Sequence, residues 1–518
     1  MKKLLISALC LAAMWSCSTD DPATPENQAG NMYMQLSLKM ETKSSTDEGA
    51  GDTNSNATPD KEVGKDYENK VSNVTIILRN GENDPVSAKV INPAAASGDT
   101  YVASFDTKEL TAGATYKVYI YANCDAPTEF SLDAVSDASI DDITEENNFW
   151  MTNANEAISV QLPSDLSPYT QPQTPYNLGA HKVERSMARF DYMAVNTGNV
   201  YAMAKNSNDA VTVNITLDSA AVINQSKAFY MLRRVSNNGD NNGWVIGGVE
   251  TPNNYVVDTD YAGKANGYSE GLVANFDAHM NNPKSWTWKS LATLTEDDNW
   301  EGTATNDHKP SSYKIMQYVK ENTLPNVNAQ EKGLTTAVVF KGQITATDNA
   351  STELKAALTS GKRIYVFNNE LYGTWADVKA AATATNADAT LAAAYNQAIV
   401  GMAEDAVDPA TDKAAAANFT GYSAENGKYY AYYYYWNRHN DNGKPYDMGN
   451  MEFAVVRNNV YKLCVDKIAK FGHPNPEDPT NPDPDPEKPE DPDESVNYYF
   501  NVTVKVLPWV VRVNHIEF

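Results

Sequence analysis

Apolar and polar residues alternate in many short runs along this chain. In the first such run, 32–40, every even position is apolar and the odd positions are mostly polar. The apolar positions are Met32, Met34, Leu36, Leu38 and Met40. Alternation with a period of two is typical of a β-strand that buries one face. The sequence therefore predicts a half-buried strand at 32–40.

Further strand patterns fall into two blocks, separated by the polar stretch Asn196–Ser207. The first block contains Val71–Leu78, Thr100–Phe105, Thr115–Ala122, Ala157–Leu162 and Lys182–Val195. The second contains Ala210–Leu217, Lys227–Val235, Thr336–Ile344, Lys428–Trp436 and Val455–Val465. Ala-rich segments with helical periodicity, Thr352–Ala357 and Trp375–Met402, interrupt the second block. We expect an all-β fold of two β-sandwich domains, the second with minor helical insertions.

A proline- and acid-rich segment follows the second block. Phe471–Ser495 holds eight prolines and nine carboxylates but only one lysine. Such a segment cannot bury a core and adopts an extended coil of about 3.1 Å per residue, which gives a reach of roughly 75 Å. A structureless segment of this length is unusual inside a compact domain.

The last residues again have a strand pattern. The apolar positions Tyr498, Phe500, Val502, Val504 and Val506 alternate with mostly polar ones. Leu507-Pro508-Trp509 ends this run, and Val510–Phe518 predicts a second strand segment. A strand with one apolar face must complete a sheet, and the long linker allows that sheet to belong to another molecule. The alternative is that the strand folds back onto its own second domain.

The first residues have the pattern of a bacterial lipoprotein signal peptide. Lys2 and Lys3 precede the apolar run Leu4–Trp15, which is too short to remain as a transmembrane helix. Ser16 stands directly before Cys17, and an acidic stretch follows. In such leaders the Cys thiol is acylated, so Cys17 is the expected attachment point to outer-membrane lipid. The alternative is an ordinary cleaved signal in which Cys17 has no role.

The acidic composition excludes one class of partner. The formal net charge is −26, so most of the surface would repel a polyphosphate, and nucleic acid is not an expected partner. No C-x-x-C pair is present, and the two cysteines after the leader, Cys124 and Cys464, lie in or beside apolar strand patterns. We expect buried free thiols, with a disulfide between them as the alternative.

The chain has no recognisable catalytic or metal-binding motif. Its six His residues are scattered, and it has neither Gly-x-Ser-x-Gly nor a P-loop. We therefore expect a protein that is not an enzyme and needs no cofactor or metal. The aromatic run Tyr429–Trp436 could stack on sugars, but alternate side chains of a strand point inward, so most of the run is expected to be core.

Five segments together resemble a known family. Besides the strand at 32–40 and the linker at 471–495, they are VERSMAR at Val183–Arg189, VRNNVY at Val456–Tyr461 and VKVLPW at Val504–Trp509. The chain resembles the fimbrillins that build the shaft of the Bacteroidales type V pilus, most closely the major shaft subunit of the short (minor) fimbriae. The resemblance implies two tandem transthyretin-like β-sandwich domains and assembly by strand exchange. In that mechanism a protease removes the N-terminal strand with its lipid anchor, and the C-terminal strand of a neighbouring subunit fills the vacated groove.

Patterns and resemblance together predict six segments. These are a lipoprotein signal peptide (1–17), a tether with the removable strand (18–43), an N-terminal domain (44–195), a C-terminal domain (196–470), the linker (471–495) and a donor-strand segment (496–518). The residues expected to fill the groove of a neighbour are Tyr498, Phe500, Val502, Val504, Val506 and Trp509.

The expected processing site departs from the family pattern. In the family, an Arg in the loop after the first strand is the cleavage point, but here no Arg precedes Arg79 and the matching position is Ser44. The adjacent Lys43 is therefore our predicted cleavage point. Weaker candidates are Lys39, Lys61 and Lys65. The alternatives are a different processing enzyme or a subunit that keeps its anchor.

The expected function is that of a structural shaft subunit, exported as an outer-membrane lipoprotein precursor and then built into a surface fimbrium that supports adhesion. Expected partners are copies of itself joined head to tail, other fimbrial subunits, the processing protease and a host or bacterial surface receptor. One alternative is a surface lipoprotein that binds glycans through Tyr432–Trp436, Trp286 and Trp288. Another is a tip or accessory adhesin, although a tip subunit needs no donor strand of its own.

Overall fold

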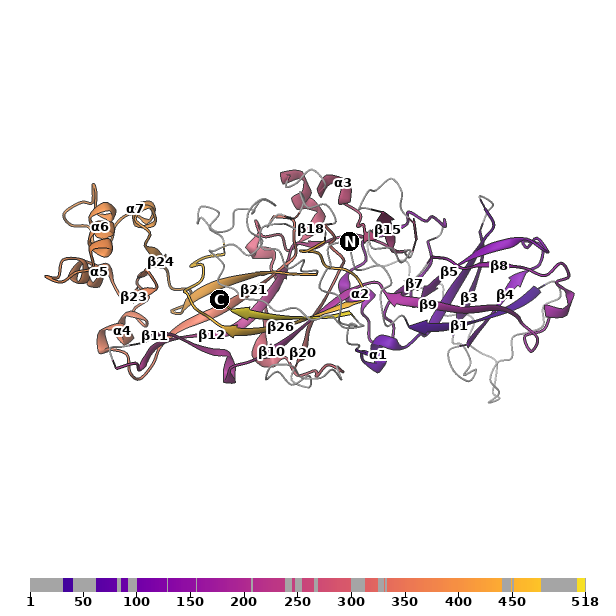
Figure 1. Ribbon diagram of the computed structural model, residues 1–518, viewed down its shortest axis with the longest axis horizontal. Helices are drawn as coiled ribbons and strands as arrows, with labels where there is room; N and C mark the ends of the chain where they lie inside the picture. The colour runs from indigo at the N-terminus through magenta and orange to yellow at the C-terminus, as the bar shows by residue number, and fades with distance from the viewer. Residues whose placement is uncertain are drawn as a thin grey trace, which may run out of the picture.

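The computed structural model describes residues 31–40, 62–81, 85–91, 100–127, 129–154, 156–205, 208–237, 245–246, 254–264, 269–299, 313–324, 330, 333–439, 449, 451–476 and 510–517. These residues form an elongated, mostly β molecule with few helices (Figure 1). A first body lies at one end, a second body follows it, and a small helical module lies at the far end. In the described part of the chain, no helix is long and apolar enough to cross a membrane.

The first body is built on one eight-stranded sheet. Its order is β3-β2-β5-β7-β9-β1-β4, with β8 beside β5. The strands are β1 (Asn31–Met40), β2 (Asn73–Arg79), β3 (Val86–Ile91), β4 (Thr100–Asp106), β5 (Thr115–Ala122), β7 (Met151–Asn153), β8 (Ser159–Gln161) and β9 (Tyr176–Arg185). Since β3 and β4, at the two ends of this order, also lie next to each other, the sheet curves almost into a barrel. The predicted strand at 32–40 is confirmed as β1, inside this sheet.

The second body consists mainly of two sheets that pack face to face. One has the order β20-β10-β26-β27, and the other has the order β11-β12-β21-β25, with β19 beside β12. The strands of the first are β20 (Lys314–Val319), β10 (Ala188–Ala194), β26 (Asn459–Lys467) and β27 (Val510–Glu517). Those of the second are β11 (Val200–Lys205), β12 (Val211–Ile223), β21 (Ala337–Ala346), β25 (Tyr429–Trp436) and β19 (Lys289–Ser290). Inward side chains of both sheets, such as Phe190 and Tyr461 from one and Phe340 and Tyr433 from the other, form a single core.

The helical module confirms the Ala-rich helices and adds one that the sequence did not predict. Its helices are α4 (Thr352–Ala357), α5 (Trp375–Ala382), α6 (Ala389–Ala398) and α7 (Thr411–Ala416), beside a small sheet of β22 (Ile364–Phe367), β23 (Glu370–Tyr372) and β24 (Thr420–Tyr422). The side chains of Ser351, Thr374 and Asp388 cap the first three helices. α7 has no such cap at Ala410, so its start carries no sequence signal.

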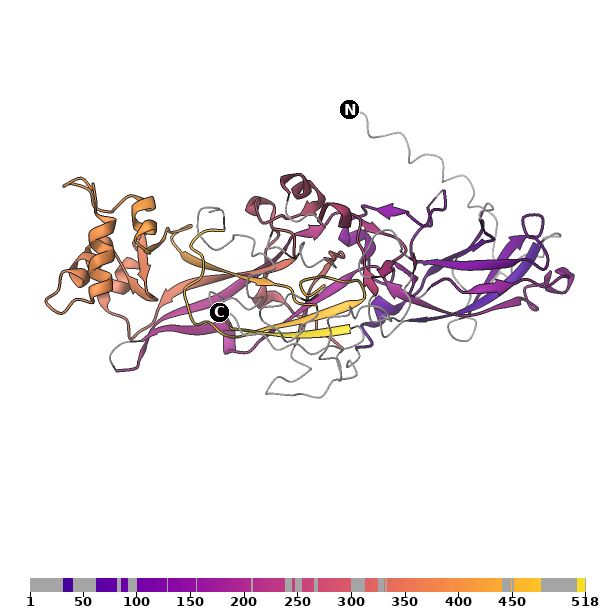
Figure 2. The ribbon, with the colours of Figure 1, turned by 45° about the horizontal axis from the view of Figure 1, so that its top comes forward.

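Short elements fill the space around the two bodies. They are β6 (Val135–Ser136), β13 (Gln225–Ser226), β14 (Phe229–Tyr230), β15 (Arg234–Asn237), β16 (Val245–Ile246), β17 (Asn254–Val256), β18 (Phe276–Asp277), α1 (Asp66–Asn69), α2 (Ile140–Ile143), α3 (Tyr261–Lys264) and the 3-10 turns η1 (Ser167–Tyr169), η2 (Thr197–Asn199), η3 (Glu270–Asn275), η4 (Pro283–Ser285) and η5 (Leu291–Thr293). α1 lies where the two bodies meet (Figure 2). Cys124 and Cys464 are both buried thiols that form no disulfide, as expected.

Three strand predictions need correction. The run Lys182–Val195 was expected to be one strand of the first body, but Ser186 and Met187 divide it into β9 and β10, which belong to different sheets. The run Lys227–Val235 is two short strands, because the backbone bends at Met231 and Leu232 between them. The run at Val455 becomes a strand only at β26, because Asn458 has a left-handed backbone (φ 57°) that precludes a continuous strand.

Candidate functional site

The first half of the candidate site is the position that β1 occupies in the sheet of the first body. This strand lies between β4, with which it is antiparallel from Asn31↔Asp106 to Ser37↔Thr100, and β9, with which it is parallel up to Met40↔Val183. Both of its edges are therefore paired, although its sequence is separated from β9 by more than a hundred residues. A strand held on both sides is a central strand, and its removal would leave two neighbours with unpaired backbone groups.

The predicted apolar face of β1 fills the interior of the first body. Met32, Met34 and Leu36 are fully buried and Leu38 is 3% exposed. Each such side chain stabilises the folded state by about 1.5–3 kcal/mol when buried. Met40 belongs to the same strand, and its backbone pairs with Val183. β1 is therefore a structural part of the core and not a loosely attached edge.

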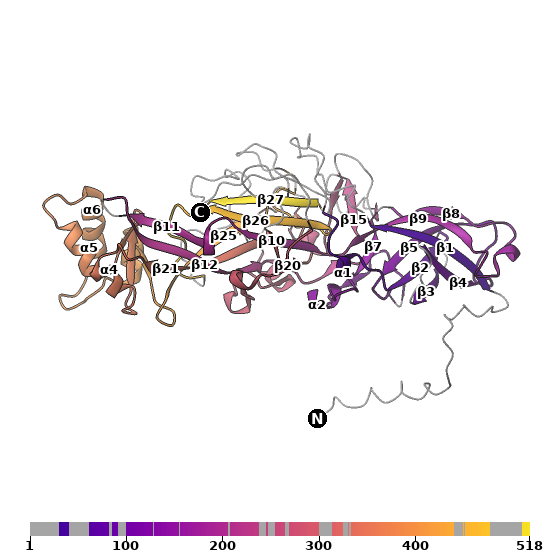
Figure 3. The same cartoon turned by 90° about the horizontal axis from the view of Figure 1, so that it is seen from below.

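The second half of the candidate site is the outer edge of β26. The C-terminal strand β27 pairs with it in parallel, from Asn459↔Val510 to Lys467↔Glu517 (Figure 3). The predicted second strand segment at Val510–Phe518 is thus a strand on the chain's own second body. Other predicted site residues lie outside the described residues: Cys17, Lys43, Ser44, Tyr498, Phe500, Val502, Val504, Val506 and Trp509.

The two halves meet at the passage from β9 to β10, which we call the junction (Arg185–Arg189). The backbone N–H of Asn458, just before β26, donates a 2.7 Å hydrogen bond to the carbonyl oxygen of Met187. Arg185 donates a 3.1 Å bond to the side-chain oxygen of the same Asn458. Because β1 ends beside Val183 and β27 begins beside Asn459, the end of β1 and the start of β27 both lie at the junction.

The strands that meet at the junction run in the same direction. β1 is parallel to β9, β26 is parallel to β10, and β27 is parallel to β26. Since β9 continues directly into β10, a chain that travelled along β1 would arrive at the junction with the direction of β27. The two strand positions are therefore consecutive along the molecule.

The linker begins on the opposite sheet of the second body. The backbone of His473 makes two 2.8 Å hydrogen bonds with Tyr432 on the edge strand β25. A side chain at Gly472 would clash, since its Cβ would lie 2.4 Å from the carbonyl oxygen of Tyr432. The proline- and acid-rich segment thus leaves from the edge of β25, while β27 returns to the edge of β26.

Two buried ion pairs lie at the junction, and one partner of each belongs to VERSMAR or to VRNNVY. Glu184 pairs with Arg233 at 2.9 Å. Arg457 binds Glu321 through Nε at 3.1 Å and through a terminal nitrogen at 3.1 Å. All four side chains are fully buried. A buried pair of this kind is strongly destabilised when one partner is removed.

The largest group of buried charges, the junction cluster, surrounds Arg189 and Lys462. Its members are Glu62, Glu68, Arg189, Asp191, Asp298 and Lys462. Arg189 Nε lies 2.8 Å from Asp191 Oδ1, and another of its nitrogens lies 2.8 Å from Glu68 Oε1. Burial alone would raise the pKa of the Glu62 carboxyl, but Arg189 and Lys462 beside it outweigh burial and hold that pKa at about 2.

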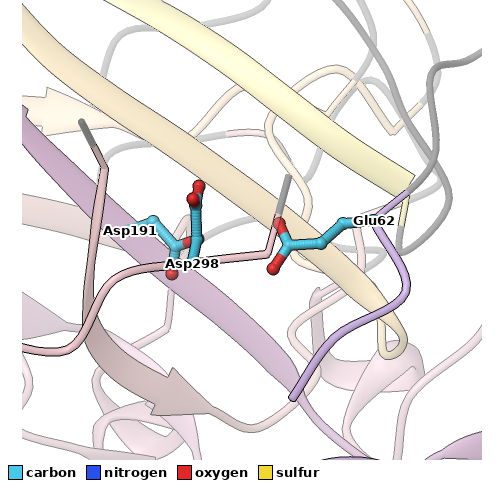
Figure 4. Close-up of side chains that lie close together, drawn as sticks. All are labelled: Glu62, Asp191 and Asp298. Carbon is cyan, nitrogen blue, oxygen red and sulfur yellow. The ribbon is translucent and has the colours of Figure 1, made fainter. Parts of the chain in front are cut away.

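Three of these carboxylates come close enough to hold a metal ion. Oxygens of Glu62, Asp191 and Asp298 all lie within 4.8 Å of one another (Figure 4). The ammonium of Lys462 contacts all three, at 2.8 Å from Glu62 Oε2, at 2.8 Å from Asp191 Oδ2 and against Asp298 Oδ2. The side chain of Lys462 therefore occupies the place that a bound cation would take.

Sequence reasoning missed this cluster. One usable signal was present, because Arg189 and Asp191 are charged residues at alternate positions of an otherwise apolar strand. Two opposite charges on one face of a buried strand indicate a buried ion pair. Their partners at 62, 298 and 462 could not be found from local pattern, since they are distant in sequence.

The aromatic run on β25 is mostly core, as expected. Tyr432 and Trp436 are buried, as is Trp286 beside them, while Trp288 is half-buried. Lys341 Nζ lies 5.9 Å from the ring centroid of Trp288 and 5.8 Å from that of Tyr432. The rings thus contact a cation of their own chain, which is typical of structural packing.

Comparison with known families decides the identity. The profile of the major fimbrial subunit protein (FimA) matches residues 34–217, from β1 to β12. The profile of the major fimbrial subunit protein type IV, fimbrillin, C-terminal, matches residues 425–515, which contain β25, β26 and most of β27. The chain belongs to the FimA family of fimbrial subunits. As a FimA-family protein it is a structural subunit of a Bacteroidales pilus, lies at the cell surface and is not an enzyme.

Solved structures of adhesins and fimbrial proteins resemble this FimA-family chain at low identity. A putative cell adhesion protein from Parabacteroides distasonis is 11% identical over 61% of this chain and 76% of its own, with a TM-score of 0.31. A putative cell adhesion protein from Bacteroides eggerthii is 14% identical over 62% and 77%, with a TM-score of 0.30. The tip fimbrial protein Mfa3 from Porphyromonas gingivalis is 14% identical over 55% and 92%, with a TM-score of 0.23. No curated protein sequence matches the chain significantly.

Proposed function

We propose that this chain is a shaft subunit that is exported as a lipoprotein anchored through Cys17, cut after its first strand and polymerised by donor-strand exchange. The observation that carries the proposal is the arrangement at the junction. The position of β1 ends where the position of β27 begins, and the two run in the same direction. One extended segment can therefore occupy both positions in succession.

Removal of β1 creates the acceptor. β4 and β9 would lose their partner between them, and the places of Met32, Met34 and Leu36 in the core would be empty. An open apolar groove between two strands with unpaired backbone groups is a site for β-augmentation. The donor face, Tyr498–Val506, offers apolar residues with the same period of two.

The donor would then continue onto the second body of the same acceptor. If Tyr498–Val506 of a neighbouring subunit takes the place of β1, then Val510 of that neighbour lies at the edge of β26. In the precursor this is where the chain's own β27 starts. Leu507-Pro508-Trp509 would cross the junction between the two positions. In the precursor, β27 docks on its own body, and in the filament the same edge receives the strand of the neighbour. Because the two surfaces of this joint differ, it propagates a filament and does not close.

Backbone pairing and hydrogen bonding argue against two of the weaker candidate cleavage points, Lys39 and Lys65. Lys39 lies within β1 and pairs with Lys182, and the backbone N–H of Lys65 is bonded to the Glu68 carboxylate at 2.6 Å. A cut after Lys65 would also detach Glu62 from the junction cluster. Cleavage after Lys43, with Ser44 as the new N-terminus, would release β1 whole and would leave Glu62 attached to the rest of the chain.

The finer division of the fold belongs to the same proposal. We assign a transthyretin-like fold to each body, with the single curved sheet of the first body enclosing its own core. We place the boundary at Ser186–Met187, and Met187 is nine residues before Asn196, where the polar stretch begins. The C-terminal domain then begins with β10 and includes the helical module.

Paired variants on the two faces of the donor strand test the mechanism. Val502→Asp places a charge on the apolar face, whereas the control Thr503→Asp places one on the opposite face of the same strand. Both precursors should be folded monomers, and after protease treatment only the control should form filaments in electron micrographs. Filaments from Val502→Asp would overturn donor-strand exchange. N-terminal sequencing of sheared filaments should begin at Ser44, and a start at Cys17 would contradict processing.

A further inference from the structure

The junction cluster has more negative than positive charge among the described residues. Its carboxylates are Glu62, Glu68, Asp191 and Asp298, and its cations are Arg189 and Lys462. Arg185 stands beside them and donates to the carbonyl oxygen of Glu68 and to the side-chain oxygen of Asn458. Even when Arg185 is included, four carboxylates face three cations.

All of these carboxylates are out of contact with water. The side chains of Glu62, Glu68, Asp191 and Asp298 have no exposed surface. An uncompensated buried carboxylate is costly, and such a group takes up a proton instead of remaining charged. The cluster therefore requires one more positive charge.

Asp298 is the carboxylate with the fewest partners. Its Oδ2 contacts Lys462, but its Oδ1 is buried and has no hydrogen-bond partner among the described residues. Asp191, by contrast, binds Arg189 with both oxygens, and Glu68 accepts hydrogen bonds from Arg189, Tyr318 and the backbone of Lys65. An orphaned oxygen on an otherwise paired cluster marks the place for an added proton.

We propose that Asp298 holds a proton in the folded protein near neutral pH, so that the junction cluster is a proton-binding site that makes the joint between the two bodies depend on pH. The groups around Asp298 support this assignment. Burial, opposed by Lys462 and reinforced by the negative charges of Asp191 and Glu62, raises the pKa of Asp298 from 3.8 to about 7. The other ionisable groups in the cluster are Glu68 in α1, Arg189 on β10 and Lys462 on β26. Those that face it are Tyr67 in α1, Arg185 on β9, Tyr313 just before β20 and Tyr318 on β20.

The sign of the effect follows from linkage. The folded pKa of Asp298 is higher than the unfolded one, so its contribution to stability is fully present below pH 3.8 and is lost as the pH rises through about 7. Burial, opposed by the nearby anions, would lower the pKa values of Arg189 and Lys462, yet the anions prevail and both stay charged throughout this range. Since Glu62 and Lys462 connect the segment before α1 to β26, ionisation of Asp298 weakens the contact between the two bodies.

Asn in place of Asp298 provides the test, with the neighbouring Asp297 as the matched control. Asp298→Asn keeps the shape of the side chain but cannot titrate, whereas Asp297 pairs with Lys314 at the surface and is 58% exposed. Urea unfolding should be measured for the full-length precursor at pH 6 and pH 8. Burial lowers the pKa values of His181 and His279 from their ordinary 6.5, so these groups also make stability depend on pH. To remove their contribution, the folding equilibrium constant of the wild type at each pH is divided by that of the variant.

Relative to Asp298→Asn, the folding equilibrium constant of the wild type should fall about tenfold from pH 6 to pH 8, as expected for one bound proton lost. The ratio of the wild-type folding equilibrium constant to that of Asp297→Asn should be the same at pH 6 and pH 8. The infrared band of a protonated carboxylic acid at pH 6 should be equally strong in the wild type and in Asp297→Asn and weaker in Asp298→Asn. A residual band is expected in all three proteins, because burial raises the pKa of Asp258 well above its ordinary value. The proposal would be overturned by an equal pH dependence of stability in all three proteins. It would also be overturned if EDTA destabilised the wild type at pH 8 and Ca²⁺ restored its stability, because a metal ion would then supply the missing positive charge.

Discussion

The backbone N–H of Asn458 and the carbonyl oxygen of Met187 form a 2.7 Å hydrogen bond at the point where the first body passes into the second. Met187 stands between β9 and β10, and Asn458 stands just before β26. This bond brings the motif VERSMAR against the motif VRNNVY. The two motifs therefore align two strand positions, one in each body.

Removal of one partner of the Arg457–Glu321 pair should be far more costly than removal of both. Arg457→Met leaves the buried Glu321 carboxylate without its bidentate partner and should cost about 3–5 kcal/mol. The double variant Arg457→Met/Glu321→Leu should be clearly more stable than the sum of the two single changes predicts. A double-mutant cycle by urea unfolding measures this coupling, and additive single effects would contradict a buried ion pair.

Lys462→Met should destabilise the protein by about 3–5 kcal/mol, because Glu62, Asp191 and Asp298 would share no ammonium. Lys117→Met is the matched control. Its amine is 3.2 Å from Glu156, and the two side chains are 48% and 50% exposed, so this loss should be under about 1 kcal/mol. Thermal or urea unfolding distinguishes the two, and equal losses would show that the junction cluster does not stabilise the fold.

Glu62→Gln should give a pH-dependent loss of stability. The folded pKa of about 2 lies below the ordinary 4.5, so the ionised Glu62 stabilises the fold above pH 4.5, and this contribution is lost as the pH falls through about 2. The variant should therefore lower the free energy of unfolding by about 3 kcal/mol at pH 7 and by less at pH 3. Glu146→Gln, an exposed residue, should change stability at neither pH. A cost for Glu62→Gln that stays constant between pH 7 and pH 3 would contradict the assigned ionisation.

The local sequence pattern was sufficient to predict the elements whose type and bounds do not depend on contacts with distant residues. β1, β5, α4 and the start of α5 follow from alternation or helical periodicity within a few residues. The break between β9 and β10 was missed because both strands are rich in apolar residues, and only the change of sheet at Ser186–Met187 separates them. The junction cluster was missed because Glu62, Asp298 and Lys462 meet only after the two bodies have folded together.

The proposal that β1 is a temporary strand makes a prediction that separates the precursor from the filament. Leu36→Ala empties part of the core of the first body and should destabilise the precursor by about 2–5 kcal/mol, because Leu36 is fully buried. Gln35→Ala, on the other face of the same strand, should have a much smaller effect. In the proposed mechanism, β1 is absent from filaments assembled after cleavage, and the neighbour's donor strand fills its place. Thermal unfolding of the filaments should therefore be the same for Leu36→Ala and the wild type. A filament that retains the loss seen in the Leu36→Ala precursor would mean that β1 stays in its groove, and exchange would then have to use another site.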